Sequence, residues 1–99
     1  MPCYALIAYD TPGSLTARLA ARPAHLARLE ALQAEGRLVL AGPCPVDEHD
    51  PAQGMVGSLV VVDFPDRASL EAWLAEEPYV HAGVYQRVEV RLFRQVFPA

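Results

Sequence analysis

The sequence contains no lysine, and this absence excludes several kinds of chemistry. All eight basic residues are arginine. Schiff-base catalysis through a side chain, lysine-anchored pyridoxal phosphate and the lysine of a Walker-type phosphate loop are therefore excluded. Twelve acidic residues give a net charge of −4, so binding to a nucleic-acid backbone is not expected. We expect neither a cofactor nor a nucleic-acid partner.

Long apolar runs and targeting signals are missing as well. No apolar run approaches the roughly 18 residues that a membrane-spanning helix needs. No basic segment leads into an apolar one at the N-terminus. We therefore expect a cytoplasmic protein without a membrane partner. Cys3 and Cys44 form neither a CxxC pair nor a disulfide framework, so both are expected to be reduced thiols.

The residues that are present predict one small domain over residues 1–99. The chain is 53% apolar, but a domain of this length buries only about 60–65% of the surface that its unfolded form exposes. Strand-like and helix-like segments alternate along it. Strands are expected at residues 3–10, 37–41, 57–64 and 84–97, and helices after Ser14, to about Glu35, and after Asp66, ending at Pro78, with a loop at 43–56. Pro23 either kinks the first helix or divides it in two.

The order βαββαβ predicts an α+β, ferredoxin-like fold, with a four-stranded antiparallel sheet and two helices on one face. The first strand is nevertheless apolar on both faces, and the third carries four consecutive apolar residues, 59–62. A bare sheet face of this kind would be a larger apolar patch than a soluble monomer normally exposes. We therefore expect a homo-oligomer, most simply a dimer, packed through the open sheet face.

His25 is the first candidate for chemistry. It borders the apolar stripe of the long helix, which is expected to face the core and consists of Leu15, Leu19, Leu26, Leu29 and Leu32. Arg18 and Arg22 lie on the same edge as His25 at helical spacing. A histidine in this position can gain or lose a proton near neutral pH and act as a general acid or base. The alternative is a structural histidine bonded to a backbone carbonyl. The carboxylates that could orient the ring are Asp10, Glu76 and Glu77.

Other catalytic patterns are weaker. Ser58, at the head of a central strand, is the nucleophile candidate most able to face a pocket, but no GxSxG surrounds it, so a hydrolase triad is not expected. The three histidines lack HxxxH or HxH spacing, so no metal site is predicted. There is no GxGxxG or GxxxxGK[ST] nucleotide loop.

An ordered set of short motifs carries a family resemblance. The motifs are Tyr9-Asp10, Arg18, Arg22-Pro23-Ala24-His25-Leu26, Gly36-Arg37-Leu38, Ala41-Gly42-Pro43, Gly57-Ser58, Glu77-Pro78-Tyr79-Val80 and Ala82-Gly83-Val84-Tyr85. With these motifs at matching separations, nearly the whole chain resembles the YciI-like (YCII-related) family, small ferredoxin-like proteins of the dimeric α/β-barrel group.

The resemblance implies an enzyme with a histidine–aspartate centre in a cleft. Related proteins act on muconolactone-type ring compounds and include a chloromuconolactone dehalogenase. The family histidine falls on His25. The family's Asp-Pro-Tyr/Phe segment falls on Glu77-Pro78-Tyr79, so glutamate stands where aspartate is usual, while Asp10 matches a second recurrent aspartate. The sequence leaves open whether Asp10 or Glu77 is the partner of His25.

We therefore expect general acid–base chemistry, an isomerase, lyase or dehalogenase-like step, on a small anionic or lactone-like compound. His25 would move the proton and Asp10 or Glu77 would orient it. The candidate substrate-binding residues are Arg18, Arg22, Ser58 and Tyr79. The alternatives are a non-catalytic module that binds a metabolite or another protein, and a purely structural oligomer.

Overall fold

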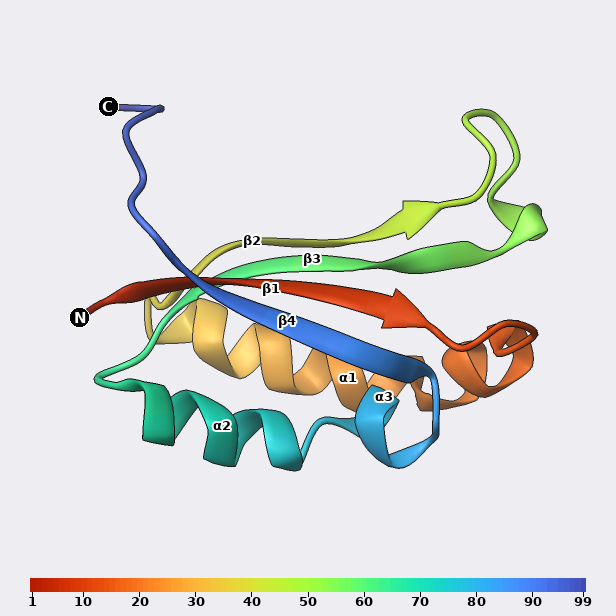
Figure 1. Ribbon diagram of the computed structural model, residues 1–99, viewed down its shortest axis with the longest axis horizontal. Helices are drawn as coiled ribbons and strands as arrows, with labels where there is room; N and C mark the ends of the chain where they lie inside the picture. Colours follow the sequence, from red (N-terminus) through yellow and green to blue (C-terminus); the bar gives the residue numbers. More distant parts are fainter.

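The chain folds into a four-stranded antiparallel sheet with its helices on one face (Figure 1). The computed structural model describes residues 1–99. Its elements are β1 (Cys3–Asp10), α1 (Leu15–Ala34), β2 (Leu38–Pro45), the 3-10 helix η1 (Pro51–Gln53), β3 (Met55–Asp63), α2 (Arg67–Ala75), α3 (Pro78–His81) and β4 (Tyr85–Phe93). The strand order is β2-β3-β1-β4, so the predicted ferredoxin-like α+β fold is confirmed. No helix has the length and apolar character required to span a bilayer.

Strand boundaries differ from the sequence prediction most at the ends of β4 and β2, for reasons of pairing. β4 ends at Phe93 rather than at residue 97, because Phe93 pairs with Cys3, the first residue of β1, and nothing follows for the chain to pair with. β2 continues beyond residue 41 to Pro45, where it pairs with Met55 of β3. Prolines are tolerated in β2 because it is an edge strand.

The helices also depart from the prediction in detail. α1 runs unbroken through Pro23. Ser14 precedes this helix but its side chain makes no capping hydrogen bond, whereas the Asp66 carboxylate accepts from the backbone N–H of Ser69, as expected of a helix cap. Pro78 was expected to end α2, but α2 ends at Ala75, and Pro78 begins a short helix, α3, that the sequence did not predict.

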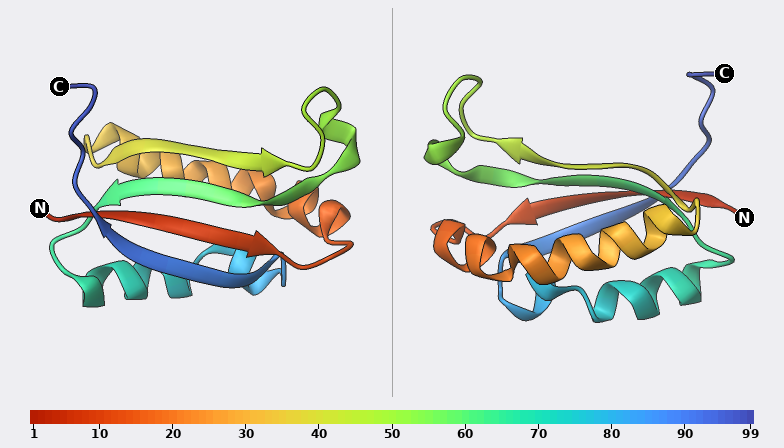
Figure 2. Two further views of the ribbon diagram at one scale, coloured as in Figure 1. Left: turned by 45° about the horizontal axis from the view of Figure 1, so that its top comes forward. Right: turned by 180° about the vertical axis from the view of Figure 1, so that it is seen from behind.

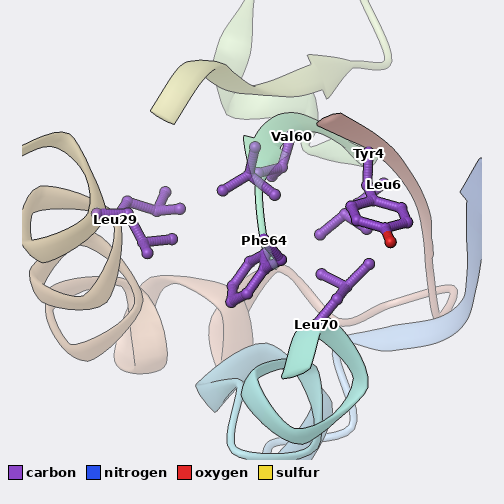
Figure 3. Close-up of a cluster of buried hydrophobic side chains, with 8 residues drawn as sticks. Tyr4, Leu6, Leu29, Val60, Phe64 and Leu70 are labelled. Atoms are coloured by element: carbon purple, nitrogen blue, oxygen red, sulfur yellow. The ribbon is translucent and has the colours of Figure 1, made fainter. Parts of the chain in front are cut away.

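The core lies between the sheet and the two long helices. Alternate residues of β1 and β3 face the helices and pack with Leu29, Leu32 and Leu70 (Figure 3). The buried positions of α1 are Arg18, His25, Leu29 and Leu32. The half of α1 nearer its N-terminus therefore turns polar side chains toward the sheet, and this is where the apolar core stops.

Gly57 fixes the closest approach of β3 to β1. A Cβ atom at residue 57 would lie 1.9 Å from the carbonyl oxygen of Ala8, which no relaxation of a side chain could relieve. Only glycine fits this position. The carbonyl of Gly57 and the side chain of the next residue, Ser58, are thereby held at the polar end of the core.

The second face of the sheet carries no helix (Figure 2). Leu59 pairs with Ile7 across β3 and β1, and both lie on this face, opposite to the buried Leu6 and Val60. Leu59 is exposed, and so is Leu40 of the edge strand β2. The open face of the sheet therefore carries exposed apolar side chains on β2 and β3, as the sequence predicts.

Candidate functional site

The polar end of the core contains four buried polar residues from three parts of the chain. Arg18 and His25 come from α1, Ser58 from β3, and Glu77 from the junction of α2 and α3. Buried polar and charged groups are stabilised only when they are paired. Their contacts therefore define the geometry of the site.

His25 is hydrogen-bonded to Glu77. The distance between Nδ1 of His25 and Oε1 of Glu77 is 2.5 Å, and the Glu77 side chain is only 2% exposed. A carboxylate accepts only, so Nδ1 carries the proton of this hydrogen bond and Nε2 of a neutral ring keeps its lone pair. The alternative of a structural histidine bonded to a backbone carbonyl describes His81, whose Nε2 lies 2.7 Å from the carbonyl of Ala75, and not His25.

The position of Glu77 is set by the start of α3. Glu77 is the N-cap of this helix, and its Oε1 also accepts from the backbone N–H of Tyr79 at 3.2 Å. A carboxylate is favourable at a helix N-terminus. The Tyr79 ring stacks on the imidazole of His25 with 4.0 Å between centroids and an interplanar angle of 16°. The start of α3 therefore contacts the His25 ring in two ways, through the hydrogen bond of Glu77 to Nδ1 and through the stacked ring of Tyr79.

Arg18 is paired with Asp10, not left free in the cavity. Its Nε donates to Oδ2 of Asp10 at 2.9 Å and its Nη2 donates to Oδ1 at 3.3 Å. Nη2 also donates to the carbonyl of Gly57 at 2.9 Å and to Oγ of Ser58 at 2.6 Å. Burial alone would lower the pKa of Arg18, but the hydrogen bonds and charge of Asp10 outweigh it and raise the pKa.

A cavity of about 160 Å³ opens beside these residues. Its polar wall consists of Arg18, Arg22, His25, Ser58 and Tyr79, and its apolar wall includes Leu26, Leu29 and Val60. Six of the eight arginines contact a carboxylate, and Arg22 is not among them. Arg22 is therefore a cation at the cavity whose charge no protein group balances.

Two tyrosines, Tyr79 in the polar wall and Tyr85 beside it, remain protonated at neutral pH. Burial raises the pKa of Tyr79, against the opposing effect of the nearby Arg18 charge. Burial raises the pKa of Tyr85 far more strongly. The Tyr85 hydroxyl is buried without a hydrogen-bond partner, and its ring meets the Tyr79 ring edge-on at 5.3 Å between centroids. Both phenols therefore keep their proton and can donate a hydrogen bond.

Of the eight candidate residues named from the sequence, seven lie at this polar end, and the pairing distinguishes them. The eighth, Glu76, is exposed at the end of α2. Of the two carboxylates between which the sequence could not choose, Glu77 contacts His25 and Asp10 contacts Arg18. Sequence reasoning missed Arg28, which contacts the second oxygen of Glu77 at 3.4 Å and follows His25 by one helical turn. His, Cys, Asp and Glu side chains nowhere gather in a group of three or more, so no residue set is arranged to hold a metal ion.

Comparison with known proteins identifies the family. The model of the YCII-related domain matches residues 3–94. The chain belongs to the YCII-related domain family. Protein YciI of Escherichia coli is 50% identical to this YCII-related chain over 96 residues, which cover 95% of the chain and 98% of the relative. An uncharacterised protein of Haemophilus influenzae is 47% identical over the same coverage.

Solved structures show the same fold in more distant proteins. A 5-chloro-2-hydroxyhydroquinone dehydrochlorinase from Burkholderia phenoliruptrix superposes on this YCII-related chain with a TM-score of 0.84 at 24% identity, covering 94% of each chain. An antibiotic biosynthesis monooxygenase superposes with a TM-score of 0.55 at 18% identity, covering 97% of this chain and 99% of the other. At these identities the likeness concerns the fold.

Proposed function

We propose that the chain, acting as one domain over residues 1–99, is an enzyme that transfers a proton to or from a small anionic or lactone-like compound. The observation that carries this proposal is the buried hydrogen bond between His25 and Glu77 at the wall of a cavity of about 160 Å³. Glu77 holds the proton of the ring on Nδ1, so that Nε2 acts as the base, and the same nitrogen returns the proton later in the reaction.

The polar groups around His25 fit a ligand with an oxyanion. Arg22 offers an unbalanced positive charge at the cavity. Oγ of Ser58 accepts from Arg18, which only donates, so the Ser58 hydroxyl can itself donate to a ligand oxygen. Arg22 and Ser58 therefore bind the anionic group, Tyr79 supplies part of the wall, and Arg18 with Asp10 orients Ser58. The apolar wall accommodates the hydrocarbon part of the ligand.

The family and the fold are consistent with an isomerase, lyase or dehalogenase-like step. The Burkholderia protein of this fold is a dehydrochlorinase and was solved in complex with 2,5-dihydroxybenzoquinone, a small oxygenated ring. Eliminating a halide begins with removal of a proton from the neighbouring carbon, which is the role proposed for Nε2 of His25. Glu77 in place of aspartate keeps the required carboxylate, and its extra methylene is accommodated by the start of α3.

Replacement of Arg22 by glutamine is expected to weaken ligand binding without changing the chemical step. A panel of small carboxylates, lactones and hydroxyquinones is incubated with the protein in D₂O, and loss of C–H signals is followed by proton NMR. For a compound that exchanges, Arg22→Gln raises the half-saturating concentration by about 10- to 100-fold, because a charge-assisted contact is lost, and leaves the maximal rate within about twofold.

Arg94→Gln is the matched control, since Arg94 also contacts no carboxylate but lies after β4 and does not line the cavity. A maximal rate that falls while the half-saturating concentration stays constant would contradict the assigned role of Arg22. A compound that binds in the cavity but never exchanges, over the whole panel, would favour the alternative function, a non-catalytic module that binds a metabolite.

We also propose that two copies of the chain pack through their open sheet faces. Support comes from the exposed Leu59 and Leu40, from the half-buried Ile7 that pairs with Leu59 on β1, and from the absence of any helix over these side chains. Apolar surface of this kind is removed from water when a second copy covers it. Along β4 the same face carries Arg87, Glu89 and Arg91, of which Glu89 contacts both arginines. These side chains would form a charged border to the contact.

Light scattering at micromolar concentration is expected to give twice the mass of one chain. Leu59→Glu places a charge in the middle of the contact and should convert the protein to a monomer, because an unpaired charge is not tolerated in a buried interface. Leu19→Glu is the matched control, since Leu19 is an exposed leucine on α1. A wild-type monomer, or a dimer that Leu59→Glu leaves intact, would contradict the proposed contact.

A further inference from the structure

Arg28 lies behind the pair formed by His25 and Glu77, outside the cavity. Its Nη1 contacts Oε2 of Glu77 at 3.4 Å, while His25 occupies the other oxygen of the same carboxylate. Arg28 and His25 are three residues apart on α1 and so lie on the same side of that helix. Glu77 therefore stands between two groups that can balance its negative charge.

The guanidinium of Arg28 is held in this place by two further contacts. Its Nη2 donates to the carbonyl of Trp73 at 2.7 Å, and its plane lies over the Trp73 ring at 4.4 Å from the centroid. Trp73 is in the last turn of α2, where a cation is favourable. These contacts join α1 to the end of α2 and fix the charge of Arg28 beside Glu77.

Each of the two carboxylates around His25 is balanced by an arginine. The charged and titratable side chains that face this region are Arg18, Arg22 and Arg28 on α1, Asp10 on β1, Glu77 and Tyr79 at the start of α3, and Tyr85 on β4. Arg18 balances Asp10 and Arg28 balances Glu77, while both tyrosines are neutral because burial raises their pKa values. The carboxylate of Glu77 is thus balanced without a positive charge on His25.

We infer that Arg28 is a positioning residue that keeps His25 neutral, with its proton on Nδ1 and the lone pair of Nε2 available to the ligand. Without Arg28, the buried charge of Glu77 would favour a second proton on the imidazole, and Nε2 would then carry a hydrogen in place of its lone pair. Arg28 thereby determines whether His25 begins the reaction as a base. The inference rests on the proposed function of His25, but it concerns a state of the ring that exists without ligand.

The test is the protonation state of His25 observed by NMR of protein containing ¹⁵N-labelled histidine, with the other two histidines assigned from His49→Ala and His81→Ala. In the wild type at pH 7.5 we expect a neutral ring protonated at Nδ1. In Arg28→Met the ratio of doubly protonated to neutral ring rises by about tenfold, the size of effect expected when a neighbouring charge is removed. Arg28→Lys keeps the charge and is expected to return the ratio toward that of the wild type.

Arg37→Met is the matched control. Arg37 also lies over an aromatic ring, that of Phe64 at 4.6 Å, donates to a backbone carbonyl and contacts a glutamate, but this glutamate is Glu35 and does not touch a histidine. An unchanged His25 ring in Arg28→Met, or an equal change in Arg37→Met, would overturn the inference. If Arg28→Met changes the ring while His25→Ala retains proton exchange, the role of Arg28 stands and the proposed function is wrong.

For a compound that exchanges, the pH profile gives a second readout. Arg28→Met should shift the rise of the exchange rate to higher pH, because more alkaline conditions are needed to remove the second proton from the ring. Damage that is merely structural would lower the rate at all pH values alike. A profile that keeps its position and falls uniformly would therefore count against the assigned role of Arg28.

Discussion

Replacement of His25 by alanine is expected to lower the maximal rate of proton exchange by about 10²- to 10⁴-fold, with little change in the half-saturating concentration. A positioned general base contributes a factor of this size. No other titratable side chain that lines the cavity can take over, because an arginine guanidinium does not lose its proton in proteins, and burial raises the pKa of Tyr79, which leaves it a phenol. The assay is the loss of C–H signal in D₂O, measured over a range of ligand concentrations.

His81→Ala is the control for this experiment. It removes a histidine that is bonded to a backbone carbonyl and does not line the cavity, so the exchange rate should stay at the wild-type value. Circular dichroism establishes that both variants are folded. Added imidazole should restore part of the rate in His25→Ala, because it can occupy the vacated space beside Glu77. Full exchange in His25→Ala would rule out the proposed mechanism.

How far the sequence predicted this site can be judged from its two carboxylates. The sequence predicts His25, Asp10 and Glu77 as candidates. His25 borders the apolar stripe of the first helix, and the two carboxylates lie at the ends of a predicted strand and a predicted helix. Which carboxylate contacts His25 depends on the path of the chain after α2. There Pro78 begins a helix of four residues, and this helix places Glu77 within hydrogen-bond distance of His25. No periodicity extends over so short an element, so the pairing was not predictable.

The stripe on α1 gives a similar lesson about the fold. Counting leucines at helical spacing predicted that residues 15, 19, 26, 29 and 32 would face the core, yet Leu19 is exposed while Arg18 and His25 are buried. A pattern of apolar residues cannot reveal a helix face on which charged groups are buried in pairs, because the partners Asp10 and Glu77 lie outside the helix, 8 and 52 residues from Arg18 and His25. The four strands and the two long helices were predicted with the correct type, whereas the short helix α3 and the buried charged residues of α1, both at the polar end of the core, were not predicted.

Replacement of Arg18 by methionine is expected to destabilise the fold by about 3–5 kcal/mol. The side chains of Arg18 and Asp10 are 7% and 5% exposed, so removal of the guanidinium leaves a buried carboxylate without a counter-charge. Methionine fills a similar volume, which limits the effect of an empty cavity. The loss is a large fraction of the stability of a domain of this size. It is measured as the change in the free energy of unfolding in urea.

Two further variants separate this charge effect from a general loss of packing. Arg67→Met breaks the exposed pair of Arg67 and Glu71 on α2, which are joined at 3.0 Å, and should cost about 0.3–0.5 kcal/mol. Addition of Asp10→Asn to Arg18→Met removes the unpaired charge and should recover at least half of the loss. If the double variant is no more stable than Arg18→Met, packing rather than the buried charge accounts for the effect. In that case Arg18 contributes to the proposed site only by orienting Ser58, and Asp10 is not needed to hold Arg18 in place.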